Sequence, residues 1–177
     1  MPRAKLWNTE KLIETFEELA LSEYLVEGIE LLKKQRIVDF IITPGKVSAK
    51  HIDDSGNANR VEIIIDTFSD EDWFNLLLRL SLESIYLAHF LCDNIPLKLE
   101  GICEELGLPL FPQNIEQIEM RYAGKVQKRA SAPLAATIHK LSERLRDEHF
   151  LLFLLRGKGS EEIISKLKQK AKTHCRN

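Results

Sequence analysis

The spacing of apolar residues changes near Arg36, and this change constrains the fold more than any other feature of the sequence. Before it, apolar side chains recur every three or four positions, which is the period of an amphipathic helix. After it, they alternate with polar side chains in three short runs that are separated by turn-forming residues. The sequence therefore predicts an N-terminal helix at residues 1–35 and a three-stranded antiparallel β-meander at residues 36–66.

The clearest helix start in the sequence is Ser69. Acidic residues follow it directly, and Ser69 and Asp72 have the spacing of a capping box. Leu78 lies off the face that this helix would bury and is a candidate contact with another copy of the chain. Four other residues share one helical face and are predicted to point into the core: Trp73, Leu76, Leu77 and Leu80.

The expected fold class is α+β, mostly helical, with the three-stranded meander packed against helices, because a sheet this small is not stable alone. The chain has 177 residues, of which 44% are apolar, and this suffices for one hydrophobic core in a single domain at residues 1–177. After the meander we expect a helical region at 69–107, a linker and loop at 108–133, and C-terminal helices at 134–172.

Cysteine use and hydropathy favour a cytoplasmic location. The sequence contains three cysteines without a Cys-x-x-Cys pair, which is typical of thiols in a reducing compartment rather than of a disulfide framework. The apolar runs are all shorter than the ~20 residues that a membrane helix requires. Contact with a membrane is therefore not expected.

Charge is distributed unequally along the chain, although the net charge is only -2. Residues 121–177 carry 14 Lys and Arg against 5 Asp and Glu, whereas residues 1–120 carry 11 against 22. This distribution argues against a protein that is uniformly basic. It indicates either a basic surface on the C-terminal part or attraction between the two parts.

Five segments, taken in order, resemble bacterial SWIM zinc finger family proteins of the type associated with Swi/Snf-type helicases. The similarity extends over most of the chain, and its specificity comes from the order and spacing of the segments rather than from any one of them. The segments are GIELLKKQRIV at 28–38, PGKV at 44–47, FSDEDW at 68–73, GLPLFP at 107–112 and FLLFLLRG at 150–157.

The resemblance implies a non-enzymatic protein that binds DNA or protein through a small element held by zinc. Counting back from the last segment places the four ligand positions of the family at Tyr122, Gly124, Ser131 and Pro133. None of these side chains is a thiolate or an imidazole, which a structural zinc site requires. The resemblance therefore implies a SWIM scaffold whose zinc site has been lost, and neither a metal nor another cofactor is expected.

Without zinc, the segment at 122–130 has few apolar side chains to bury, so the sequence predicts a flexible basic loop. One hypothesis is that this region and the helix after it contact the phosphates of a nucleic acid. Aromatic side chains for base stacking are nearly absent from the region. The candidate phosphate contacts are Arg121, Lys125, Lys128, Arg129, Lys140 and Arg144.

The favoured hypothesis is protein–protein interaction, with the chain acting as an accessory subunit of a larger complex. The family resemblance implies a Swi/Snf-type helicase as a partner. Enzymatic activity is not expected, because the sequence lacks a glycine-rich phosphate loop, a Gly-x-Ser-x-Gly motif and a His-Glu-x-x-His motif.

Overall fold

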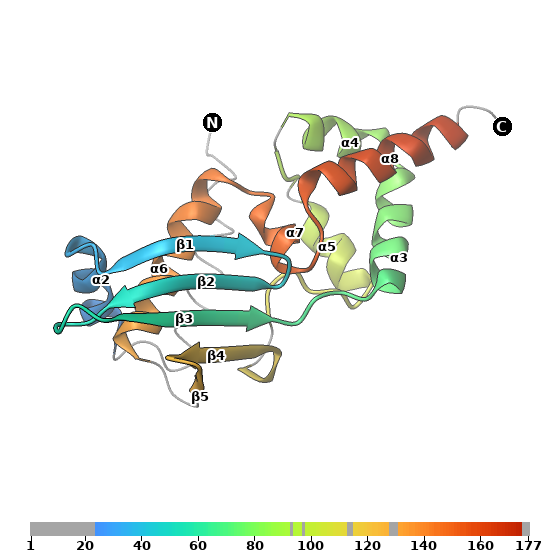
Figure 1. The fold of residues 1–177 in the computed structure, drawn as a ribbon. Coiled ribbons are helices and arrows are strands. Elements are labelled where there is room, and N and C mark those ends of the chain that lie inside the picture. The colour runs from blue at the N-terminus through green and yellow to red at the C-terminus, as the bar shows by residue number, and fades with distance from the viewer. Residues whose placement is uncertain (1–23, 93, 97, 113–114, 128–130, 175–177) are drawn as a thin grey trace.

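A computed structural model of the protein describes residues 24–174 except 93, 97, 113–114 and 128–130 (Figure 1). A five-stranded sheet lies beside a group of helices. The elements are, in order, α2 (Leu25–Lys33), β1 (Ile37–Thr43), β2 (Lys46–Ile52), β3 (Ala58–Ile65), α3 (Asp70–Ser81), α4 (Ser84–Leu91), α5 (Lys98–Glu105), η3 (Ile115–Gln117), β4 (Ile118–Tyr122), β5 (Lys125–Gln127), α6 (Ala132–Asp147), α7 (Leu151–Leu155) and α8 (Ser160–His174).

The sheet has the strand order β1-β2-β3-β4-β5, and every neighbouring pair is antiparallel. Its two faces differ because side chains alternate along each strand. One face packs on α6, which lies behind the sheet in Figure 1, and α2 packs against α6 in turn. Residues on the α6 side, such as Val47, Val61, Ile63 and Met120, are fully buried. The opposite face carries charged residues, and no helix of the described residues covers it.

The predicted three-stranded meander at 36–66 is wrong in extent, although its three strands are present as β1, β2 and β3. Two further strands, β4 and β5, come from the region 108–133 that was predicted to be a linker and loop. Strand β4 pairs with β3 through contacts such as Val61 with Tyr122, although residues 66–117 separate the two strands in sequence. The mostly helical prediction is also wrong, since helices make up 52% of the described residues.

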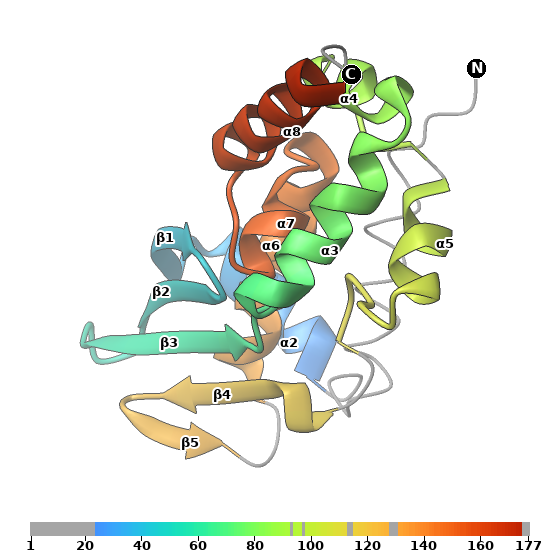
Figure 2. The same cartoon turned by 90° about the vertical axis from the view of Figure 1, so that its right-hand side faces the viewer.

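Helix α3 begins as the sequence predicts. The Ser69 hydroxyl accepts a hydrogen bond from the backbone N–H of Asp72 at 3.1 Å, and the Asp72 carboxylate accepts one from the Ser69 backbone at 2.9 Å, so the capping box is confirmed. The four residues predicted to face the core, Trp73, Leu76, Leu77 and Leu80, are each no more than 2% exposed. Helix α3 then packs beside α4 and α8 in a second helical layer (Figure 2).

Helix α2 lies very close to α6, and Gly28 permits this approach. A Cβ atom added at Gly28 would lie 2.8 Å from the backbone nitrogen of Ala136 and 3.0 Å from the Cβ of Ala135. Helix α2 is the described part of the helix predicted at 1–35; the part before residue 24 lies outside the described residues. Within the described residues, every helix is too short or too polar to span a bilayer.

Candidate protein-interaction groove

The predicted basic residues do not form one surface. Arg121 lies on the face of the sheet opposite α6, where its Nε is 2.5 Å from the Glu119 carboxylate. Lys140 and Arg144 lie on α6 itself, on the other side of the sheet. Lys125 begins the short edge strand β5 and is exposed. The two remaining candidates, Lys128 and Arg129, lie outside the described residues.

Partners within the chain already engage three of these cations. Arg144 pairs with Glu148 at 2.6 Å, and the Lys140 ammonium lies 5.6 Å from the centroid of the Phe40 ring. Arg121 pairs with Glu119, as described above. A phosphate would have to compete with these contacts, so the structure favours phosphate binding in this region less than the sequence alone does.

The four positions that the SWIM resemblance would assign to zinc ligands lie in or beside strands β4 and β5 and helix α6. Tyr122 ends β4, Gly124 lies in the β4–β5 turn with a φ of 78°, Ser131 is the N-cap of α6, and Pro133 lies in its first turn. The prediction of a flexible loop is therefore wrong for residues 122–127, because the pairing of β4 with β5 orders them. Residues 128–130 of that loop lie outside the described residues.

A histidine contacts one of these positions. His51 Nδ1 lies 3.0 Å from the hydroxyl of Tyr122, on the side of the sheet that faces α6. Burial lowers the pKa of His51 and raises the pKa of Tyr122, so both side chains stay neutral at physiological pH. Across the described residues, His, Cys, Asp and Glu nowhere gather in a group of three that could hold a metal ion.

The open face of the sheet is neutralised by its own ion pairs. The carboxylate of Glu62 is buried, at 2.5 Å from Lys46 Nζ and 3.5 Å from Arg60 Nε. The hydrogen bond from Lys46 is the main reason that the pKa of Glu62 is lowered. Arg121 lies directly across from Glu62 in the β3–β4 ladder. These charges are complementary across the strands, which stabilises the sheet.

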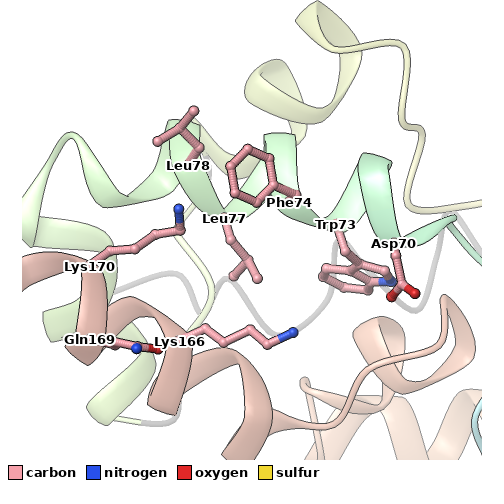
Figure 3. A pocket seen from close by; sticks show the side chains of 8 residues that line it. All are labelled: Asp70, Trp73, Phe74, Leu77, Leu78, Lys166, Gln169 and Lys170. Atoms are coloured by element: carbon pink, nitrogen blue, oxygen red, sulfur yellow. The ribbon is translucent and has the colours of Figure 1, made fainter.

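An apolar groove lies between α3 and α8. We call it the α3–α8 groove; its volume is about 600 Å³, and Figure 3 shows how its residues lie. Trp73 and Leu77 point from α3 toward α8 and form the buried floor. The groove is lined by Asp70, Trp73, Phe74, Leu77 and Leu78 of α3 and by Lys166, Gln169 and Lys170 of α8.

The rim of the groove on α3 is apolar and exposed. The side chain of Phe74 is 57% exposed and that of Leu78 is 40% exposed. Beyond the groove, Leu82 at the end of α3 and Ile85 at the start of α4 are 59% and 51% exposed. Single exposed apolar residues are normal on a protein surface, but two neighbouring ones on the rim of an apolar hollow are typical of an interaction site.

The rim on α8 is basic. Lys166 Nζ lies 2.8 Å from Glu162, and the Lys170 ammonium lies 4.5 Å from the centroid of the Phe74 ring, so it reaches across the groove from one helix to the other. Near Asp70, Lys158 bridges Asp70 at 3.5 Å and Glu162 at 2.8 Å. The hydrogen bond between Lys158 and Glu162 raises the pKa of the lysine and lowers the pKa of the glutamate.

The lining of the groove is apolar at its floor and carries charged side chains at its rim. Its floor is aromatic and aliphatic, and its titratable side chains are Asp70, Lys166 and Lys170. Of these residues, the sequence predicted Leu78 to lie off the buried face of its helix, and it is 40% exposed, whereas its contact with another copy of the chain stays a prediction. Lys166 and Lys170 were missed, because their proximity to α3 depends on how two helices distant in sequence pack together. Their spacing of four residues, which places both on one face of a helix, was the available signal.

Comparison with known proteins adds one relative. The chain is 24% identical over 164 residues to the uncharacterized protein Rv2102 of Mycobacterium tuberculosis, and the aligned region covers 93% of this chain. The chain spans 59% of the length of that relative. No family model matches the sequence, and no solved structure matches it. The name of the relative assigns no activity, so the resemblance to SWIM zinc finger proteins stays a prediction.

Proposed function

We propose that the protein is a non-enzymatic binding protein that docks a helical segment of a partner protein in the α3–α8 groove. The observation that carries this proposal is the exposed apolar rim of Phe74 and Leu78 above a buried floor of Trp73 and Leu77. Aromatic and aliphatic anchors beside a hollow supply most of the binding energy in protein interfaces. A helix fits because the two walls are themselves helices, and an amphipathic helix laid in an apolar groove is a common mode of recognition.

The charge arrangement supports a protein partner over a nucleic acid. Among the described candidate phosphate contacts, Arg121, Lys140 and Arg144 already have partners and lie on two sides of the sheet. Nucleic-acid binding generally requires several cations on one surface. The family resemblance adds that a Swi/Snf-type helicase, within a larger complex, is the first partner class to test.

The proposal is tested by photo-cross-linking in cells that naturally produce the protein. A benzoylphenylalanine at position 74 reports on the groove, and one at position 126 is a matched control, since Phe74 and Val126 are both 57% exposed. We expect position 74 to give one cross-linked product in stoichiometric amount. The same product should not form from position 126, and it should be lost in the Leu78→Glu variant.

Two results contradict the proposal. One is the absence of a stoichiometric product from position 74. The other is the same set of products from both positions, because non-specific contact would give that pattern. Leu78 is 40% exposed, so Leu78→Glu leaves the core intact, and its circular dichroism spectrum and unfolding midpoint are expected to match those of the wild type.

A further inference from the structure

We infer that the segment bound in the α3–α8 groove is an amphipathic helix with acidic residues along the edge of its apolar face. This inference rests on the proposed function and adds the chemistry of the partner. It comes from the asymmetry of the groove, in which the α3 wall is apolar apart from Asp70 at one end and the α8 wall carries Lys166 and Lys170 (Figure 3).

The apolar wall sets the length of the bound segment. Phe74 and Leu78 are four residues apart on this wall, and Leu82 continues the same spacing just past the end of α3 and of the groove; their exposed fractions are 57%, 40% and 59%. At 1.5 Å of rise per residue, this row is about 12 Å long. A helix lying along the row therefore needs about two turns to cover it, with apolar residues at every third or fourth position.

The basic wall sets the charge of the bound segment. Lys166 and Lys170 are four residues apart on α8, so both point from one face of that helix into the groove. Lys166 already contacts Glu162 at 2.8 Å, but an ammonium group has three N–H donors and can bind a second carboxylate. Two glutamates spaced by one helical turn on the partner would match the two lysines.

On binding, the contact between Lys170 and Phe74 would give way to a contact between Lys170 and the partner. In the free protein the ammonium lies 4.5 Å from the centroid of the aromatic ring and partly covers it. A hydrogen bond between an ammonium and a carboxylate is stronger than an exposed cation–π contact. A carboxylate on the partner would therefore draw Lys170 off the ring and expose Phe74 to the apolar face of the same partner. An uncharged or basic helix would lack this means of opening the groove.

The inference is tested with two synthetic fluorescent peptides that share the same leucine positions of an amphipathic helix. One peptide carries glutamates beside its apolar face, and the other carries lysines at the same positions. Binding to the full chain is measured by fluorescence anisotropy at low salt. We expect the acidic peptide to bind at least tenfold more tightly than the basic peptide, and Leu78→Glu to abolish the binding of the acidic one.

Reversing the charge of Lys166 and Lys170 tests whether these two lysines select the acidic peptide. The Lys166→Glu/Lys170→Glu variant is expected to invert the preference, so that the basic peptide binds more tightly. The matched control is Lys50→Glu, because Lys50 is exposed on the sheet away from the groove and its reversal is expected to leave the acidic peptide bound as before. Lys166 and Lys170 lie at the surface of α8, so the double variant is expected to keep its fold, which circular dichroism checks.

Failure of this inference is distinguishable from failure of the proposed function. Equal affinities for the two peptides, or no binding of either, would overturn the acidic-helix inference. So would a protein that is cross-linked from position 74 through a basic or uncharged segment, although that result would still support protein docking in the groove. The absence of a cross-linked partner would count against the proposed function itself.

Discussion

The guanidinium of Arg156 donates from Nη1 to the backbone carbonyl of Asp66 at 2.7 Å, which joins two residues that are 90 positions apart in sequence. The same side chain donates from Nε to the carbonyl of Leu110 at 2.9 Å and from Nη2 to that of Pro109 at 2.8 Å. Arg156 is only 2% exposed, and burial lowers its pKa to about 10, so it remains charged at neutral pH. Its own carbonyl accepts the indole N–H of Trp73 at 3.0 Å. Arg156 therefore fixes the helices that carry the groove to the end of β3.

Replacement of Arg156 by Met is expected to destabilise the protein by about 3 kcal/mol or more, because three carbonyl groups lose their donor inside the protein. Arg156→Lys is expected to recover only part of this loss, since an ammonium cannot reproduce the planar fork of the guanidinium. Urea unfolding measures both. The surface variant Arg79→Met is the control and is expected to change stability by less than about 0.5 kcal/mol. Similar midpoints for Arg156→Met and Arg79→Met would contradict the role of Arg156.

Gly28→Ala is expected to destabilise the protein by about 1–3 kcal/mol, because the added methyl group meets the backbone of α6 at 2.8 Å. The matched control is Gly101→Ala in α5, where an added Cβ has no heavy atom within 4 Å. That change is expected to stabilise the protein by about 0.5–1 kcal/mol, since alanine favours a helix more than glycine does. Thermal unfolding checks whether the midpoint falls in Gly28→Ala and rises in Gly101→Ala. Shifts of both midpoints in the same direction would contradict the close packing of α2 on α6.

Glu62 is expected to make stability depend on pH in the acid range. Its pKa is lowered from the ordinary value of 4.5, chiefly by the hydrogen bond from Lys46. Because the pKa of Glu62 is lower in the folded state, its stabilising contribution is fully present at a pH above its pKa in the unfolded chain. The contribution is lost as the pH falls through its pKa in the folded protein. Glu62→Gln should therefore be less stable than the wild type at pH 7, by about 1–3 kcal/mol, and should lose less stability below pH 4.5. The prediction is checked by urea unfolding across this pH range. It would be contradicted if the midpoints of the wild type and of Glu62→Gln changed by the same amount with pH.

The two described cysteines are expected to differ in reactivity. Cys92 is exposed, whereas Cys103 is buried and its pKa is raised to about 12, mainly by desolvation. A thiol reacts as the thiolate, so Cys103 should be unreactive in the folded protein at pH 8. In a Cys175→Ser background, a coloured thiol reagent should label one equivalent rapidly and the second only after denaturant is added. Rapid labelling of both would show that Cys103 is accessible.

The basic residues between 121 and 144 are expected to contribute little to nucleic-acid binding. Double-stranded DNA, titrated by fluorescence anisotropy, should bind no more tightly than the non-specific range of about 10⁻⁴ to 10⁻⁶ M. Lys125→Glu should leave the titration unchanged. A tight complex that Lys125→Glu abolishes, with a steep dependence on salt, would restore the phosphate-contact hypothesis.

Several features followed from the sequence because they depend on neighbours along the chain. Strands β1 to β3 have a side-chain period of two and are separated by short turns, so their pairing is local. The start of α3 at Ser69 depends on a hydrogen bond to a residue three positions later, and the buried face of α3 depends on a helical period that can be counted. The exposure of Leu78 was predictable for the same reason.

Only the tertiary structure decided the rest. Strand β4 is five residues long and forms because β3 offers it an edge, and β5, which is three residues long, pairs with β4 in turn. The α3–α8 groove forms where Lys166 and Lys170 are brought beside Phe74 and Leu78 from 88 to 96 residues away in sequence. Neither the pairing of β4 with β3 nor the packing of α8 on α3 changes the spacing of apolar residues along the chain, so that spacing could not predict them. The energy that forms both comes from burying surfaces that are distant in sequence, so it is set by the packing of the whole chain.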